Sequence, residues 1–257
     1  MINYTIDDSH EVKFNTASGK HEILKNGKAL EEKLPILFKY LPFNNNTIAS
    51  LMQGYFSLTN PADFNDPFDC NKTMIVDYEH PIHLKDKVRN YFEDVGICSF
   101  SEKQNNPLMW AHYTNNYNGV MLEFQFNDFE GFLYPERFKS LEWRKVIYTN
   151  YVNGLHKGFP LSEAILLTSK IKHWEYENEW RIIGKLGDSE NRYLPFPRDA
   201  LKNIYIGHNL FDNHSSEIHI LYTIQQTYYP NAKIFRVIPD QTRNFAYRVQ
   251  RVFDFPK

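Results

Sequence analysis

The chain has 257 residues, a formal net charge of −2, and 42% hydrophobic residues, with aromatic residues making up 16%. This length and composition can bury a core, either as one large domain or as two smaller ones. The small net charge excludes a global basic field for nucleic acid or anionic membranes. No apolar run approaches the roughly 20 residues that span a bilayer, and the opening residues lack a signal-peptide pattern. With only Cys70 and Cys98, we expect reduced thiols, no membrane contact and a cytoplasmic location.

Residues 1–33 are polar, and "NTASGK" and "KNGK" are typical of turns between short strands. Their apolar residues are too sparse and irregular to supply the face of a core. We therefore expect an N-terminal extension or hairpin region over 1–33, followed by a single α+β catalytic-type domain over 34–257.

The next segment predicts strand, helix and strand in turn. "ILFKYL" indicates a short buried strand, and "NNTIASLMQG" indicates a helix with an Asn cap and Gly54 at its end. "YFSLTNP" is typical of a further strand. The "FNDPFD" loop that follows contains Asn65, Asp66 and Asp69. Such residues in turns mostly bond their own backbone, so we expect the loop to be structural first.

Hydrophobic periodicity predicts the remaining elements. They are a helix over 81–95, a strand over 96–102, a helix over 106–119, strands over 120–126 and 143–150, a helix over 160–174, strands over 179–186 and 201–210, a helix over 215–230, and strands over 232–240 and 245–252. No internal repeat or linker divides the chain. The pattern therefore predicts an α+β fold with a mainly antiparallel sheet, continuous or split, and flanking helices.

The segment "HWEYENEWRI", residues 173–182, alternates aromatic and charged residues as a strand does. One predicted face consists of Trp174, Tyr176, Trp180 and Ile182, and the other of Glu175, Glu177, Glu179 and Arg181. Two interpretations are open. The charged face is either the wet side of an antiparallel strand or the edge of an active site.

Two further segments contain candidate site residues. "MWAHYTNNYNG" places Trp110, His112 and Tyr113 on a short helix, as a packed aromatic helix or as a ligand site. "GICSFSE" places Ser99 and Ser101 on one face of a strand, where serines are usually solvated. A catalytic serine would need a neighbouring base, which the sequence does not identify.

The motifs "FKY", "FNDPFD", "CSFSE", "LMWAHY", "GVMLEF" and "WEYENEWRI" occur in that order. Together they resemble a bacterial family known as domain of unknown function number 2971, across about residues 36–240. The arrangement in turn resembles, remotely, the ADP-ribosyltransferase plan: a strand with a basic residue, a serine strand, and a late strand with Glu-x-Glu. Lys39 stands where that plan usually has Arg or His.

The second resemblance implies an NAD-dependent ADP-ribosyltransferase-like enzyme, of the kind that acts as a bacterial toxin or phage-defence effector. NAD would be the substrate, the acceptor would be nucleic acid or protein, and a neutralising partner protein would accompany a toxin. Glu179 would stabilise the oxocarbenium-like transition state, and Glu177 would orient or deprotonate the acceptor. The residues expected to bind NAD are Lys39, Tyr40, Ser99, Ser101, Trp110, His112 and Tyr113.

Two other classes of function are open. The first is a binding module that holds a nucleotide or peptide without turnover. The second is a metal-assisted nuclease or phosphodiesterase that would use Asp66, Asp69, His112 and Glu177. No HExxH, paired CxxC or EF-hand spacing occurs, so the sequence predicts no metal site of a known type.

Overall fold

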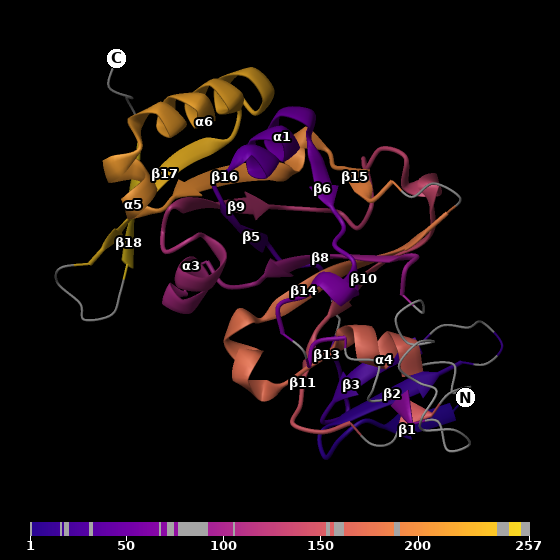
Figure 1. Ribbon diagram of the computed structural model, residues 1–257. Helices are drawn as coiled ribbons and strands as arrows, with labels where there is room; N and C mark the ends of the chain where they lie inside the picture. The colour runs from indigo at the N-terminus through magenta and orange to yellow at the C-terminus, as the bar shows by residue number, and fades with distance from the viewer. Residues whose placement is uncertain are drawn as a thin grey trace. The chain divides into compact units, whose positions relative to one another are not determined.

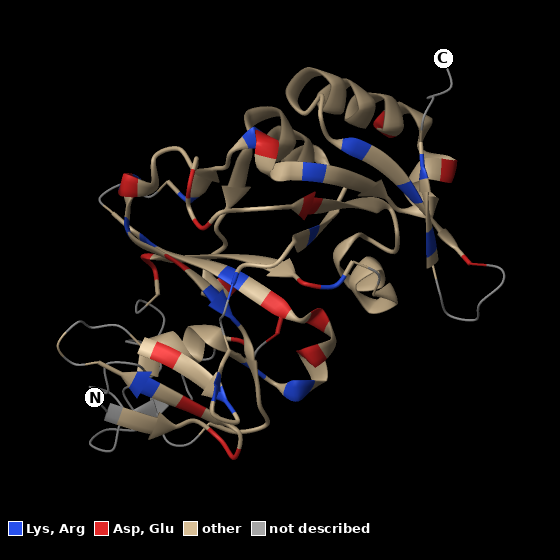
Figure 2. Cartoon of the chain, turned by 180° about the vertical axis from the view of Figure 1, so that it is seen from behind, with Lys and Arg blue, Asp and Glu red and all other residues tan. Residues whose placement is uncertain are grey.

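The computed structural model describes residues 2–15, 17, 21–30, 33–66, 68–70, 75–76, 92–104, 106–152, 155–156, 162–187, 191–240 and 247–252. The chain forms two compact units. The first consists of Met1–Leu34, Leu58–Cys98 and Glu136–Arg192, and the second of Pro35–Ser57, Ser99–Pro135 and Tyr193–Lys257. Helices are combined with sheets in which antiparallel pairs dominate, which confirms the predicted α+β class (Figure 1). Acidic and basic residues are interspersed along the chain, as the small net charge suggests (Figure 2).

The N-terminal residues form an antiparallel sheet in the first unit. Its strands are β1 (Ile2–Thr5), β2 (His10–Phe14), β3 (His21–Lys25) and β4 (Lys28–Ala29). Ile6, Val12 and Ile23 are buried in one cluster with Ile165 and Leu166 of α4 (Ser162–Thr168). The expectation that residues 1–33 supply no core face is therefore wrong at these positions. Whether residues 34–257 fold alone stays a prediction.

The first unit also contains β10 (Phe138–Lys145) and β14 (Glu179–Leu186), which pair antiparallel, and β14 neighbours β8 (Val95–Ser101). Strand β8 contributes Val95–Cys98 to the first unit and its last three residues to the second. Two short parallel pairs complete this unit: β11 (Ile147–Tyr148) with β13 (Ser169–Lys170), and β7 (Ile75–Val76) with β12 (Leu155–His156).

The segment 173–182 is not a continuous strand. Lys172–Glu177 form a 3₁₀ helix, η4, and β14 begins only at Glu179. Backbone bonds from Trp174 N to Ile171 O and from Asn178 N to Glu175 O close the helical turns. Asn178 has a left-handed backbone (φ 44°), a conformation that Asn tolerates better than most residues and that a strand does not contain. Local turns therefore replace the predicted strand in the first half of the segment, and only its last residues, from Glu179, form a strand.

In the second unit, neighbouring strands follow the order β8, β5, β9, β16, β17 and β18. Their bounds are β5 (Leu37–Pro42), β9 (Gly119–Phe124), β16 (Leu201–Ile206), β17 (Lys233–Pro239) and β18 (Tyr247–Arg251). Only β16 and β17 run parallel among the described pairs of this unit. The second unit also contains a short antiparallel pair, β6 (Tyr55–Ser57) with β15 (Tyr193–Pro195).

The helices of the second unit lie on both sides of its strands. Figure 1 shows α1 (Asn45–Gln53) beside α6 (Ser215–Tyr228) on one side and α3 (Pro107–Tyr113) on the other. Short helices η5 (Arg198–Ala200) and α5 (His208–Asn213) flank β16. The side chain of Asn44 accepts from the N–H of Thr47, and Gly54 ends α1 with φ 74°, which confirms both predicted ends.

The core of the second unit is a set of phenylalanine rings. Phe56 contacts the rings of Phe100, Phe124 and Phe196 at centroid distances of 5.1, 5.2 and 4.3 Å. Edge-to-face and stacked pairs of this kind add to the stabilisation from apolar burial.

Two predicted helices differ from the structure or fall outside it. Most of the helix expected over 81–95 lies outside the described residues, and residues 92–94 form a turn. The helix expected over 160–174 ends at Thr168, because Ser169 and Lys170 pair with β11 as strand β13. Both faces of that strand are buried, which local periodicity does not reveal.

Candidate functional site

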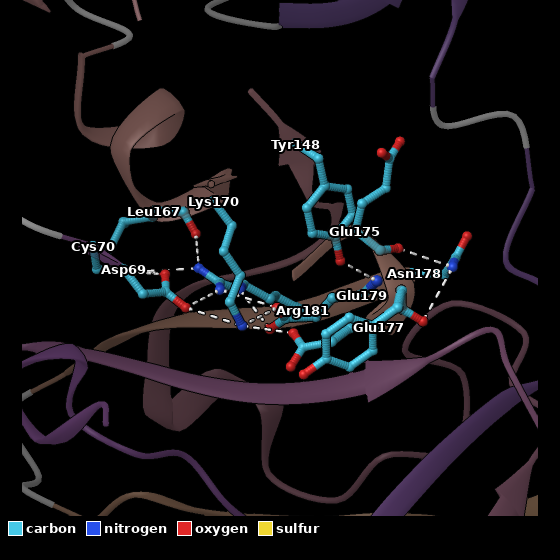
Figure 3. Close-up of polar contacts among 11 residues, drawn as sticks. Asp69, Cys70, Tyr148, Leu167, Lys170, Glu175, Glu177, Asn178, Glu179 and Arg181 are labelled. Atoms are coloured by element: carbon cyan, nitrogen blue, oxygen red, sulfur yellow. Dashed lines mark hydrogen bonds and ion pairs between the residues drawn. The ribbon is translucent and has the colours of Figure 1, made fainter. Parts of the chain in front are cut away.

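Five charged side chains of the first unit form a buried ion cluster: Asp69, Lys170, Glu177, Glu179 and Arg181 (Figure 3). Lys170 Nζ lies 2.6 Å from Glu177 Oε2, 3.2 Å from Glu179 Oε2 and 3.4 Å from Asp69 Oδ2. Arg181 donates from Nε to Glu179 Oε1 at 2.8 Å and from Nη2 to Asp69 Oδ2 at 2.7 Å. Charges this deeply buried persist only when they are paired and hydrogen-bonded, as these are.

The ion cluster is assembled from several elements. Glu179 and Arg181 are two residues apart on β14 and so project to one face of the strand. Lys170 ends β13, and Glu177 ends η4. The left-handed turn at Asn178 separates the two glutamates and allows both carboxylates to reach the same ammonium group.

Tyr148 fixes the start of β14. Its hydroxyl oxygen accepts from the backbone N–H of Glu179 at 2.8 Å. Burial, with the Glu179 carboxylate as the next cause, raises the pKa of Tyr148 far above its ordinary value, so the hydroxyl stays protonated. The residue therefore holds the backbone of Glu179 in place as a neutral group.

The cations of the ion cluster stay charged despite their burial. Burial alone would lower the pKa of Lys170, but the carboxylates of Glu179, Glu177 and Asp69 outweigh it and raise that pKa. For Arg181, burial is likewise outweighed by Glu179 and Asp69, which raise its pKa. Among the described residues, the ion cluster thus brings three carboxylates together with two buried cations.

The guanidinium of Arg181 is 0% exposed and makes further contacts besides its carboxylates. Nη1 donates to Leu167 O at 2.7 Å and to Cys70 Sγ at 3.3 Å, and the guanidinium carbon lies 5.6 Å from the ring centroid of Phe64. Burial raises the pKa of the Cys70 thiol well above its usual range, so this cysteine is not a reactive thiolate. Arg181 thereby connects β14 to the loop that contains Asp69 and Cys70.

The prediction of one wet, charged face on this segment is wrong. Glu177, Glu179 and Arg181 are buried, whereas the side chain of Glu175 is 56% exposed and lies near Lys25. The cause is the 3₁₀ helix, which places Glu175 and Glu177 in different surroundings. Sequence reasoning missed Lys170, although a lysine directly after the apolar run "AILLTS" was an available signal.

The other candidate residues belong to the second unit, where Tyr40, Ser101 and Trp110 come together. Phe38 of β5 pairs with Ser101 of β8, so alternation places Tyr40 and Ser99 on the same face as Ser101. The Tyr40 hydroxyl donates to Lys103 O at 2.7 Å, and its ring meets that of Trp110 edge to face at 5.5 Å. Ser101 is buried and accepts from the N–H of Lys103, which is a structural contact.

Lys39 lies on the opposite face of β5. Its Nζ donates to the backbone carbonyl of Ser99 at 3.0 Å and lies 5.1 Å from the ring centroid of Phe100. On α3, His112 is exposed and Tyr113 half-buried, and their rings are 6.3 Å apart. Lys39 is thus not grouped with Tyr40, Ser101 and Trp110, and Glu177 and Glu179 belong to the other unit.

Sequence reasoning also missed the aromatic neighbours of Trp110. Tyr117 stacks on Trp110 at 6.0 Å, and its ring lies 4.7 Å from that of His208 and 5.4 Å from that of Tyr247. Tyr117 is the last of three consecutive residues with positive φ, after Asn115 and Asn116. The "NNYN" run was the available signal, since Asn tolerates the left-handed region.

The described residues contain no group of three or more His, Cys, Asp or Glu side chains arranged to hold a metal ion. Between Asp69, Glu177 and Glu179 the Lys170 ammonium takes the position that a cation would need. The metal-assisted nuclease therefore gains no support from this part of the chain. Among the described segments, no helix has the length and apolar character required to cross a membrane.

The family model described as "Protein of unknown function (DUF2971)" matches residues 109–182. This supports the resemblance to that family over the matched segment, which contains η4 and four of the five members of the ion cluster. Neither the curated proteins nor the solved structures provide a match to the chain. The resemblance to ADP-ribosyltransferases stays a prediction.

Proposed function

We propose that the chain is an NAD-dependent ADP-ribosyltransferase-like enzyme with nucleic acid or protein as the acceptor. The observation that carries the proposal is the order of neighbouring strands. The plan described above needs a basic strand, a serine strand and a late Glu-x-Glu segment. Here these are β5, β8, and η4 together with β14, because Glu177 ends η4 and Glu179 begins β14. In the second unit β5 pairs with β8, and in the first β8 neighbours β14.

The charge of the ion cluster supports the same chemistry. Cleavage of the bond between nicotinamide and ribose develops positive charge on the sugar, and a preorganised negative charge stabilises it. Among the described residues, the ion cluster holds three carboxylates at fixed positions beside two cations. Glu179 is held by both Arg181 and Lys170, and the Glu177 carboxylate contacts Lys170 at the end of η4. We therefore assign these two carboxylates a role at the reacting sugar.

The wider setting of the proposal rests on the resemblance alone. It includes action as a bacterial toxin or phage-defence effector in the cytoplasm, with a neutralising partner protein. The NAD contacts proposed for Tyr40, Ser99, Ser101 and Trp110 belong to the same proposal, and Lys39 would need a side-chain rearrangement to join them.

The test is release of nicotinamide from NAD, together with transfer of label from NAD to protein or nucleic acid. Glu177→Gln is the first variant, and Glu175→Gln is its matched control, because Glu175 is an exposed carboxylate of the same helix. We expect Glu177→Gln to lower turnover on the order of 10²-fold, equivalent to about 3 kcal/mol of transition-state stabilisation, and the control to leave it unchanged.

Glu179→Gln is less clean as a probe of catalysis, since it removes charge from the partner of a buried guanidinium. Its melting temperature must be recorded beside its activity. If the wild-type chain binds NAD but releases no nicotinamide with either acceptor class, the transferase proposal is wrong and a binding module takes its place. Full activity of Glu177→Gln would remove that residue from the mechanism.

A further inference from the structure

The loop "FNDPFD" contains a buried polar atom that the ion cluster does not use. Asp66 is 8% exposed, and its Oδ1 accepts from the backbone N–H of Phe68 at 2.9 Å. Its Oδ2 is fully buried and has no hydrogen-bond partner in the structure. The predicted structural role of Asp66 in the turn therefore accounts for only one of its two oxygens.

An unpartnered carboxylate oxygen in the interior has lost its contact with water without gaining a hydrogen bond in return, so it calls for an explanation. A purely structural turn would not need it, since Ser or Asn at this position also accepts from the N–H two residues on. Among the described residues, the cations next to the loop do not supply a partner. Lys170 and Arg181 make their ion pairs with Asp69, Glu177 and Glu179.

Asp66 lies one turn from the ion cluster. The N–H of Asp69 donates to the carbonyl of Asp66 at 3.1 Å, and Asp69 is itself a member of the ion cluster. The guanidinium of Arg181 also lies over Phe64, two residues before Asp66. The free oxygen therefore belongs to the loop that borders the proposed reaction site.

From this geometry we propose that Asp66 Oδ2 accepts a hydrogen bond from a ribose hydroxyl of the bound nucleotide. A carboxylate is the group that dinucleotide-binding sites commonly use for a ribose hydroxyl. An O–H to carboxylate bond is short and strong, and it satisfies the buried oxygen without a counter-ion. This assignment rests on the proposed function, because it takes NAD as the ligand, and it names which residue of the chain recognises the sugar.

The test compares binding of NAD, ADP-ribose and free nicotinamide by calorimetry. Asp66→Asn keeps an oxygen for the N–H of Phe68 and replaces the other oxygen by a donor. Asp66→Ser keeps a turn-forming hydroxyl and has no second oxygen. Asp63→Asn is the matched control, because Asp63 is an exposed acid of the neighbouring 3₁₀ helix η1 (Pro61–Asp63). Melting temperature is recorded for all three.

We expect both Asp66 variants to bind NAD and ADP-ribose about 10- to 100-fold more weakly, with nicotinamide binding unchanged and no decrease in melting temperature. Asp63→Asn should bind like the wild type. If Asp66→Asn and the wild type bind ADP-ribose with equal affinity, the assignment is wrong. It is also wrong if Asp66→Asn loses as much affinity for nicotinamide as for ADP-ribose. If the wild type binds neither NAD nor ADP-ribose, it is the proposed function that fails. If the wild type binds ADP-ribose but Asp66→Asn has a lowered melting temperature, the affinity of Asp66→Ser for ADP-ribose decides whether the assignment holds.

Discussion

The two units differ in the chemistry of their cores. The first buries five charged side chains of the ion cluster together with aliphatic residues, whereas the second buries a set of phenylalanine rings. Apolar packing is non-directional and tolerates changes of shape, but a buried ion pair is stable only while every partner is present. Chemistry that needs charge at a fixed position is therefore more readily built on the first core. The second core is suited to holding strands in register.

The largest expected effect comes from removing Arg181, one of the two cations of the ion cluster. Arg181→Met should lower the free energy of unfolding by about 3–5 kcal/mol, because it leaves Asp69 and Glu179 buried with Lys170 alone. Urea unfolding measures the change. The control is Lys185→Met, whose ion pair with Asp94 is exposed (48% and 41% of the two side chains) and should contribute at most about 1 kcal/mol. If the two variants lose the same free energy of unfolding, burial is not the reason that breaking the ion cluster is destabilising.

The next effect is a dependence on pH that the first core should show. Asp7 is buried in the turn between β1 and β2, and its Oδ1 accepts from the N–H groups of Ser9 and His10, both at 2.8 Å. Burial would raise the pKa of Asp7, but the hydrogen bonds from Thr149, Ser9 and His10 outweigh it and lower that pKa. The folded state therefore stays ionised to lower pH than the unfolded state. The stability from Asp7 is present above its ordinary pKa and is lost as pH falls toward the lowered value.

Asp7→Asn should lower stability at neutral pH by on the order of 1–2 kcal/mol, and the gap to the wild type should close as the pH falls from about 5 to about 2. Urea unfolding at several pH values measures it, with the exposed neighbour Asp8→Asn as control. A gap that stays constant with pH would show that the carboxylate charge of Asp7 does not stabilise the fold.

The smallest effect is expected in the second core. Phe56→Leu retains an apolar side chain among Phe100, Phe124 and Phe196, so it should lower stability by about 1 kcal/mol, without dependence on pH or salt. Thermal unfolding at low and high salt measures it. A loss as large as that of Arg181→Met would mean that the ring contacts are as demanding as the ion pairs, and the difference between the two cores would disappear.

The sequence by itself determined the elements whose signals are local. An Asn cap and Gly54 marked both ends of α1, and short apolar runs identified β9 and β16 as strands, since capping and local apolar patterns depend only on neighbours in the chain. The α+β class followed from the sum of these elements. The pair Glu177 and Glu179 was also recognisable as a candidate site, because two carboxylates among aromatic residues are visible in the sequence whatever structure the segment adopts.

The partners of those carboxylates were decided only by the tertiary structure. Arg181 and Asp69 are 112 residues apart in the chain, and Lys170 joins them through the pairing of β11 with β13. Local turns, ending at the left-handed Asn178, made Lys172–Glu177 a 3₁₀ helix where alternation predicted a strand. The fold also left Asp66 Oδ2 without a partner while its other oxygen closed the turn. A sequence pattern records which side chains are charged, but which charges are buried together depends on contacts between segments that are distant in the chain.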